Sequence, residues 1–206
     1  MAKQLDDRSA LRPARLPIFP LHSVLYPGGV LPLKIFEQRY MEMAKRCLSE
    51  RSMFGVCLIA RGNEVGDPAE PHAVGSSASI EQWDMQQLGV LRVEARGGQR
   101  FRIRSQAADA SGLIHAEVEW IAPEPLLPVP EAQSDLVPLL RAIADDIGPQ
   151  RWPPPHEFDD AAWVGYRYCE VLPIPALARQ KLLELTDSIS RLEIIQRFLN
   201  QRGVLS

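Results

Sequence analysis

The sequence predicts an α+β protein with a strand-rich amino-terminal part and a helical carboxy-terminal part. Up to residue 121, short apolar runs and alternating apolar and charged residues are separated by prolines and glycines, as in β-strands. After a proline-dense break, apolar residues recur every three or four positions, which is the spacing of amphipathic helices. We therefore expect a flexible tail over residues 1–14, a β-rich part over 15–121, a linker over 122–134 and a helical part over 135–206.

The β-rich part begins with a stretch that prolines interrupt repeatedly, residues 16–40. Proline lacks a backbone donor, so it suits strand starts, sheet edges and turns. We expect a strand over residues 15–19, a turn over 26–29 and a second strand over 30–35. An amphipathic helix should follow. Its expected apolar face carries Phe36, Tyr40, Ala44, Cys47 and Leu48.

Further strands are expected along the rest of this part. Residues 53–60 form a continuous apolar run, which indicates a strand buried on both faces, and another strand is expected over 74–85. In residues 91–104, apolar and charged residues alternate on both sides of Gly97-Gly98. That pattern predicts two antiparallel strands joined by a turn at the glycines. The alternation returns over residues 114–121, which predicts one more strand.

The helical part should contain four helices. Prolines across residues 122–133 indicate a semi-rigid spacer before the first of them. Asp135 is placed to cap the first helix and Asp159 the second. Pro175 suits the first turn of the third, and Thr186-Asp187 should cap the last.

Composition sets limits on function. The 206 residues carry a net charge of -3, with 46% hydrophobic and 24% charged residues, which is ordinary for a globular protein. Nothing in this balance favours nucleic acid or an anionic membrane. The amino terminus has no apolar signal region, and no apolar run reaches the roughly 18 residues of a membrane span. Cys47, Cys57 and Cys169 form no CxxC pair, so we expect core thiols and a cytoplasmic location.

The opening stretch also resembles the start of the N-terminal, substrate-binding domain of Lon proteases, which also occurs as a free-standing bacterial protein. A Gly-x-Gln-Arg segment at Gly97 to Arg100 resembles a turn of the same family. The resemblance covers most of residues 15–201. It implies a PUA-like β pseudo-barrel with one early helix, followed by a C-terminal helical bundle. The matching positions in the opening stretch are Pro20, Leu21, Pro27, Gly28, Pro32, Leu33, Phe36, Glu37, Arg39 and Tyr40.

The chain offers little sequence evidence for catalysis. None of its four lysines follows a glycine, so a P-loop is excluded, and no context favours a lysine as the base of a Ser–Lys dyad. His156-Glu157 lacks the second histidine of an HExxH zinc motif. Cys47 and Cys57 lie in apolar surroundings that suit buried thiols. We therefore expect no catalytic residue, no cofactor and no metal, although a Cys–His pair could still meet in space.

Two charged groups call for an interpretation. We expect Glu37, Arg39 and Arg100 to form a partly buried structural network, either between the helix start and the 91–104 strands or at the Pro-Gly turn. The second group is a basic strand face, which could contact RNA phosphates. A solvated face is the favoured interpretation, because the chain is acidic and no aromatic residues are interleaved. This face comprises Arg92, Arg96, Arg100, Arg102 and Arg104.

The resemblance implies a non-catalytic module that binds unfolded or extended polypeptide segments, and an adaptor role in protein quality control or proteolysis. We expect an apolar groove between the β-rich part and the helical part, with candidate walls at Tyr26 and Gly29 and at Trp152 and Phe158. Two alternatives stay open: an RNA- or nucleotide-binding PUA-like protein, and a stand-alone hydrolase. The sequence is compatible with a homo-oligomer and disfavours nucleic acid and membranes as partners.

Overall fold

The computed structural model describes residues 14–87 and 89–205, so most of the predicted flexible tail lies outside the described residues. The chain divides into two compact units. The β unit comprises residues 14–27 and Leu31–Pro123. The helical unit comprises Gly28–Val30 and residues 124–205.

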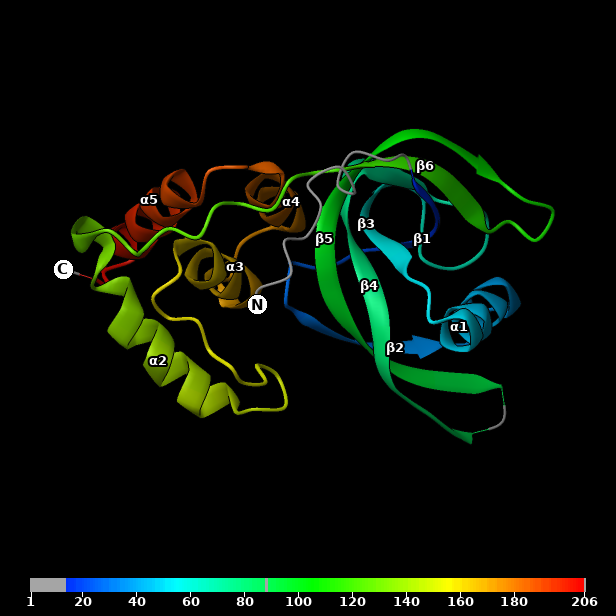
Figure 1. The fold of residues 1–206 in the computed structure, drawn as a ribbon, viewed down its shortest axis with the longest axis horizontal. Helices are drawn as coiled ribbons and strands as arrows, with labels where there is room; N and C mark the ends of the chain where they lie inside the picture. Colours follow the sequence, from blue (N-terminus) through cyan, green and yellow to red (C-terminus); the bar gives the residue numbers. More distant parts are fainter. Residues whose placement is uncertain (1–13, 88, 206) are drawn as a thin grey trace, which may run out of the picture. The chain divides into compact units, whose positions relative to one another are not determined.

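The β unit is a barrel with one additional strand (Figure 1). The strand order is β2-β5-β4-β3-β1-β6, and β5 also pairs with β6, which closes the ring from β5 to β6. β1 and β3 are parallel, whereas β3–β4, β4–β5, β5–β6 and β1–β6 are antiparallel. The expected β pseudo-barrel with one early helix is confirmed. Its elements are β1 (Ala14–Leu21), β2 (Val30–Ile35), α1 (Gln38–Glu50), β3 (Phe54–Arg61), β4 (Glu70–Gln87), β5 (Val90–Ala108) and β6 (Ile114–Trp120).

Apolar side chains fill the barrel and the space between it and α1. β3 is buried from Phe54 to Ile59, as its uninterrupted apolar run predicted. Tyr40 of α1 stacks on Phe19 of β1, with ring centroids 4.1 Å apart. Ala44 and Cys47 continue the buried face of the helix. The helix is therefore held by its apolar stripe, as amphipathic helices generally are.

The prediction of a turn at Gly97-Gly98 is wrong, because β5 runs without interruption from Val90 to Ala108 (Figure 1). These glycines instead allow neighbouring parts of the chain to approach the backbone of β5 closely. A Cβ at Gly97 would collide with the carbonyl oxygen of Tyr26, and one at Gly98 would lie 2.6 Å from the hydroxyl of Ser77. β5 pairs with β4 on both sides of these glycines, and Gly89, with φ +82°, belongs to the connection between the two strands.

The helical unit contains a short 3-10 helix and four α-helices. Asp160 caps α3 by accepting hydrogen bonds from the amides of Ala162 and Trp163, so the prediction of Asp159 missed by one residue. Asp135 makes no side-chain cap, because the preceding 3-10 turn already leads into α2. Asp187 caps α5 as predicted. The elements are η2 (Glu131–Gln133), α2 (Leu136–Ile147), α3 (Ala161–Val171), α4 (Ala176–Glu184) and α5 (Ser188–Gln201).

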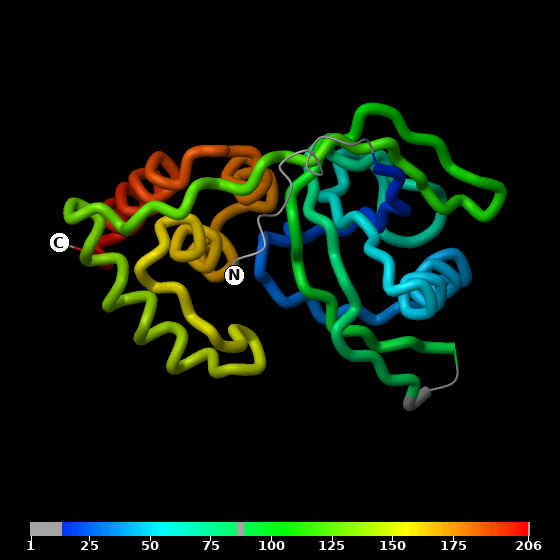
Figure 2. Tube along the Cα trace, viewed as in Figure 1, coloured from blue at the N-terminus to red at the C-terminus, as the bar shows by residue number. Residues whose placement is uncertain are grey.

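The proline-rich segment expected as a linker is attached to the helical unit from residue 124 onward. Its first anchor is Glu124, whose carboxylate accepts two hydrogen bonds from Arg191 of α5, at 2.8 and 2.6 Å. Further along, Gln196 of α5 donates a hydrogen bond to the carbonyl of Ala132. Figure 2 shows the segment running alongside α5. These contacts fix in place a stretch that its composition alone marks as a spacer.

The Pro-Gly turn of the opening stretch contributes residues 28–30 to the helical unit. Gly28 has φ +72°, a conformation that glycine adopts without strain. Its carbonyl accepts a hydrogen bond from Arg167, and the carbonyl of Val30 accepts one from Arg151. Arg167 also forms an ion pair with buried Glu170 at 3.1 Å. The turn is thus held by arginines of the helical part of the chain.

Candidate functional site

A groove of about 750 Å³ follows β2 and lies within the β unit. This volume is in the range of ligand sites in proteins. We call it the β2 groove. Its lining comes from the end of β1, all of β2 after Val30, the start of α1, the β3–β4 loop and facing parts of β4 and β5. The lining residues outside β2 are Phe19, Leu21, Ser23, Phe36, Glu37, Tyr40, Glu64, Val65, Gln82, Trp83, Asp84, Arg92, Val93 and Glu94.

β2 forms the centre of the groove. It lies at one end of the strand order, with β5 as its neighbour among the described strands. Along the strand, exposed Pro32 and Lys34 alternate with buried Leu33 and Ile35. This alternation is that of a strand with one face on a core and one toward solvent. Proline and lysine are residues that protect outer strands from pairing with another chain.

Three large apolar side chains of the lining are exposed. Phe36 is 56% exposed, Val65 56% and Trp83 59%. They come from three segments far apart in the sequence, yet they line one cavity. An apolar surface that gathers around a groove is characteristic of a binding site, because single exposed apolar residues are otherwise scattered.

Arg39 anchors the wall of the groove next to α1. Its Nη2 donates to the carboxylate of Glu37 at 2.9 Å and to the carbonyl of Gly66 at 2.7 Å, and its Nη1 donates to the carbonyl of Gly112. The side chain of Arg39 is 6% exposed and that of Glu37 21%. The Glu37–Arg39 pair of the expected network is therefore present, and it ties the start of α1 to two loops. The expected link of this pair to Arg100 or to the Pro-Gly turn stays a prediction. Arg100 is buried as well.

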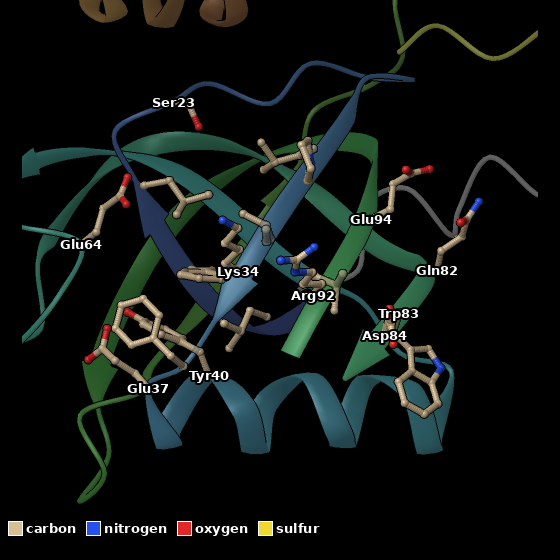
Figure 3. A pocket seen from close by; sticks show the side chains of 18 of the residues that line it. Ser23, Lys34, Glu37, Tyr40, Glu64, Gln82, Trp83, Asp84, Arg92 and Glu94 are labelled. Atoms are coloured by element: carbon tan, nitrogen blue, oxygen red, sulfur yellow. The ribbon is translucent and has the colours of Figure 1, made fainter. Parts of the chain in front are cut away.

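Charged side chains are distributed along the groove rather than gathered at one point. Figure 3 shows Glu37 and Glu64 at one end and Gln82, Trp83, Asp84 and Glu94 at the other. Lys34 and Arg92 lie between the two ends (Figure 3). The carboxylate of Glu64 accepts a hydrogen bond of 2.6 Å from the backbone amide of His22. The lining therefore carries more carboxylates than cations.

The family-signature residues separate into two groups. The signature residues outside the groove lining are Pro20, Pro27, Gly28, Arg39, Gly97 and Arg100. Phe36, expected on the apolar helix face, stands instead before the first turn of α1 and is exposed. The signature residues that do line the β2 groove are Leu21, Pro32, Leu33, Phe36, Glu37 and Tyr40.

The groove walls expected from sequence are internal positions. Tyr26 and Trp152 are 0% and 1% exposed, and Gly29 and Phe158 are also buried. The Trp152 indole N–H donates to Glu170 at 2.8 Å, and the Phe158 ring packs against Trp163 with centroids 5.1 Å apart. This environment favours packing roles, so a groove at these positions stays a prediction. Sequence reasoning missed Val65 and Trp83, which are large apolar residues within polar stretches.

The predicted basic strand face is interrupted. Arg100 is 2% exposed rather than solvated, and it lies at a register shift in the β4–β5 ladder. Arg96 pairs with Glu81 at 2.8 Å, and Arg104 pairs with Glu119. These cross-strand carboxylates offset two of the remaining charges. The surface therefore lacks the continuous basic stripe typical of nucleic-acid binding.

One cluster of the β unit joins a serine, a histidine and an aspartate. Ser111 donates its hydroxyl to Asp109 at 2.6 Å, and His115 bonds the other oxygen of that carboxylate at 3.0 Å, so the serine and the histidine both engage the aspartate. These hydrogen bonds lower the pKa of Asp109 to about 2, and the bond from Ser111 has the largest effect. Burial raises the pKa of the Cys57 and Cys47 thiols, which disfavours a thiolate. Over residues 14–87 and 89–205, no cluster of three or more His, Cys, Asp or Glu suits a metal ion.

Comparison with known proteins gives a family match over most of the chain. Residues 15–201 match the model of the "ATP-dependent protease La (LON) substrate-binding domain". A crystal structure of a Lon N-terminal domain protein from Xanthomonas campestris is similar, with a TM-score of 0.75 and 35% identity. The alignment covers 89% of this chain and 98% of that one. The N-terminal domain of a Mycobacterium avium complex Lon protease, at 20% identity and a TM-score of 0.58, shares the fold.

Longer proteins are also similar to this chain. Lon protease of Anaeromyxobacter dehalogenans is 25% identical over 206 residues, which is 92% of this chain and 23% of that protein. The protein cereblon of Danio rerio is 27% identical over 159 residues, which is 75% of this chain and 36% of that protein. The chain thus spans about a quarter to a third of the length of these relatives.

Proposed function

Because the chain belongs to the family of LON substrate-binding domains, we propose that it binds extended polypeptide segments in the β2 groove without catalysing a reaction there. The observation that carries the proposal is that exposed Phe36, Val65 and Trp83 all line the β2 groove. Unfolded segments expose apolar side chains, and covering these side chains in a groove is favourable. A folded protein would offer few such side chains to a groove of this size.

Side-chain contacts, rather than strand addition, provide the affinity in this proposal. An extended peptide can add to an outer strand through main-chain hydrogen bonds. Pro32 has no backbone donor, and exposed Lys34 places a charge beside it. Both features oppose pairing along the middle of β2. Aromatic and aliphatic side chains of the segment would instead contact Phe36, Val65 and Trp83.

Delivery of the bound segments to a separate protease is the cellular role that we propose, in the cytoplasm. No disulfide links Cys47, Cys57 and Cys169, which is consistent with a reducing compartment. Among the helices described, none has the length and apolar character needed to cross a membrane. The name of the family, which describes the substrate-binding part of an ATP-dependent protease, supports the link to proteolysis.

The test is a binding titration with a fluorescently labelled, permanently unfolded model polypeptide, followed by anisotropy. Trp83→Ala should weaken binding about fivefold or more, because truncating an aromatic side chain that dominates a binding site costs more than about 1 kcal/mol. The matched control is Leu177→Ala on α4, which removes an equally exposed apolar side chain outside the groove and should leave affinity unchanged. Absence of binding by the unaltered protein, or equal affinity of both variants, would contradict the proposal.

A further inference from the structure

Given the proposed polypeptide binding, on which this step rests, we infer a specific subsite within the β2 groove. Phe36 and Val65 form one apolar subsite, which takes a bulky apolar side chain of the bound segment. Glu64 beside it selects a basic residue next to that side chain. The preferred ligand is therefore an extended segment in which a large apolar residue is flanked by lysine or arginine.

The hydrogen bonds of Arg39 bring the two apolar residues together. A single nitrogen, Nη2, donates both to the side chain of Glu37 and to the backbone carbonyl of Gly66. Glu37 directly follows Phe36, and Gly66 directly follows Val65. The exposed side chains of Phe36 and Val65 therefore project from neighbouring segments of the same wall. They are 56% exposed each, so both remain accessible to a ligand.

The loop that carries Val65 is held on both sides of this residue. On one side, the Glu64 carboxylate accepts from the His22 amide at 2.6 Å. On the other side, the Gly66 carbonyl accepts from Arg39 at 2.7 Å. A subsite fixed before binding loses little conformational entropy when a ligand arrives, which favours affinity. Arg39 thus acts as a positioning residue, because its partners are a wall of the groove and not the ligand.

The two carboxylates at this end of the groove, Glu37 and Glu64, differ in whether a cation of the protein neutralises their charge. Glu37 forms an ion pair with Arg39, whose side chain is 6% exposed. The partner of Glu64 is a neutral backbone amide, so that hydrogen bond leaves its negative charge in place. The cations of the lining, Lys34 and Arg92, lie between the two ends of the groove (Figure 3). A basic residue of the ligand is therefore complementary to the Phe36–Val65 end.

The experiment compares labelled unstructured peptides that have one central phenylalanine flanked by lysine, glutamine or glutamate. Anisotropy should show the lysine peptide binding about 3- to 10-fold more tightly than the glutamate peptide, with the difference shrinking as salt is added. Glu64→Gln keeps an acceptor for the His22 amide and removes the charge, so it should abolish most of this preference. Glu117→Gln, an exposed carboxylate on β6 outside the groove, should leave the preference intact.

A second variant tests the apolar contact. Val65→Ser should lower affinity for the phenylalanine peptides severalfold and leave a matched peptide with central serine unaffected. Thermal melts followed by circular dichroism establish that each variant is folded. Equal affinity for the lysine and glutamate peptides, or an unchanged preference in Glu64→Gln, would overturn the subsite while leaving polypeptide binding in place. Failure of every peptide to bind would overturn the proposed function itself, and the subsite with it.

Discussion

Replacement of Glu124 by alanine should destabilise the helical unit strongly, because it would leave a buried guanidinium without its counter-charge. The side chains of Arg191 and Glu124 are 0% and 2% exposed and form two hydrogen bonds. Burial lowers the pKa of Arg191, but the hydrogen bonds to Glu124 and the electrostatic attraction of Tyr166, Glu124 and Cys169 together leave the pKa raised. Removing one partner of such a pair costs about 3–5 kcal/mol. Glu124→Ala also removes the acceptor of the Tyr166 hydroxyl.

Urea denaturation followed by circular dichroism at a helical wavelength measures this loss. Glu193→Ala, which removes an exposed carboxylate from α5, is the control and should change the free energy of unfolding by less than about 0.5 kcal/mol. A loss below about 1 kcal/mol in Glu124→Ala would refute the reasoning. It would mean that the proline-rich segment is not held by this ion pair and behaves as the linker that its composition predicts.

Two further predictions concern the β unit. Gly97→Ala should lower the free energy of unfolding by about 1–3 kcal/mol, because the new Cβ would collide with the Tyr26 carbonyl. Ser105→Ala, at an exposed site of β5, should leave the free energy of unfolding unchanged. Equal stability of the two variants would contradict the close approach of Gly97 to Tyr26. The pKa of Asp109 is lowered from 3.8 to about 2, so the unfolded state binds more protons between these values and stability should fall as pH decreases through that window. Asp109→Asn should show a smaller fall in urea titrations at these pH values, and an identical pH profile would count against the hydrogen bonds from Ser111 and His115.

Local sequence patterns were sufficient for much of the fold. The bounds of β2 and of α2, the first α-helix of the helical unit, agree with the apolar periodicity, and β3 follows its continuous apolar run. Asp187 was identified as a cap because capping depends on the few residues that follow it. These features share one property: the interactions that determine them lie within a few residues.

The failures have non-local causes. Gly97-Gly98 indicates a turn in isolation, but its neighbours in space are Tyr26 and Ser77, which no local pattern can reveal. Phe36 fits the apolar stripe of α1 by spacing, yet it precedes the first helical turn and points away from the packed face. A family resemblance gave the fold but not the site. The β2 groove could not be found by spacing, because its walls meet only when the barrel closes.

Hydrogen–deuterium exchange of the full chain, with and without a saturating unfolded polypeptide, tests polypeptide binding in the β2 groove most directly. The account predicts slower exchange over the β2 groove, in residues 31–37, 64–66 and 82–84, and unchanged exchange in α2 and α5. The Trp83→Ala protein, measured alongside, should show less of this protection. Protection confined to the helical unit, with the β2 groove unaffected, would contradict the account.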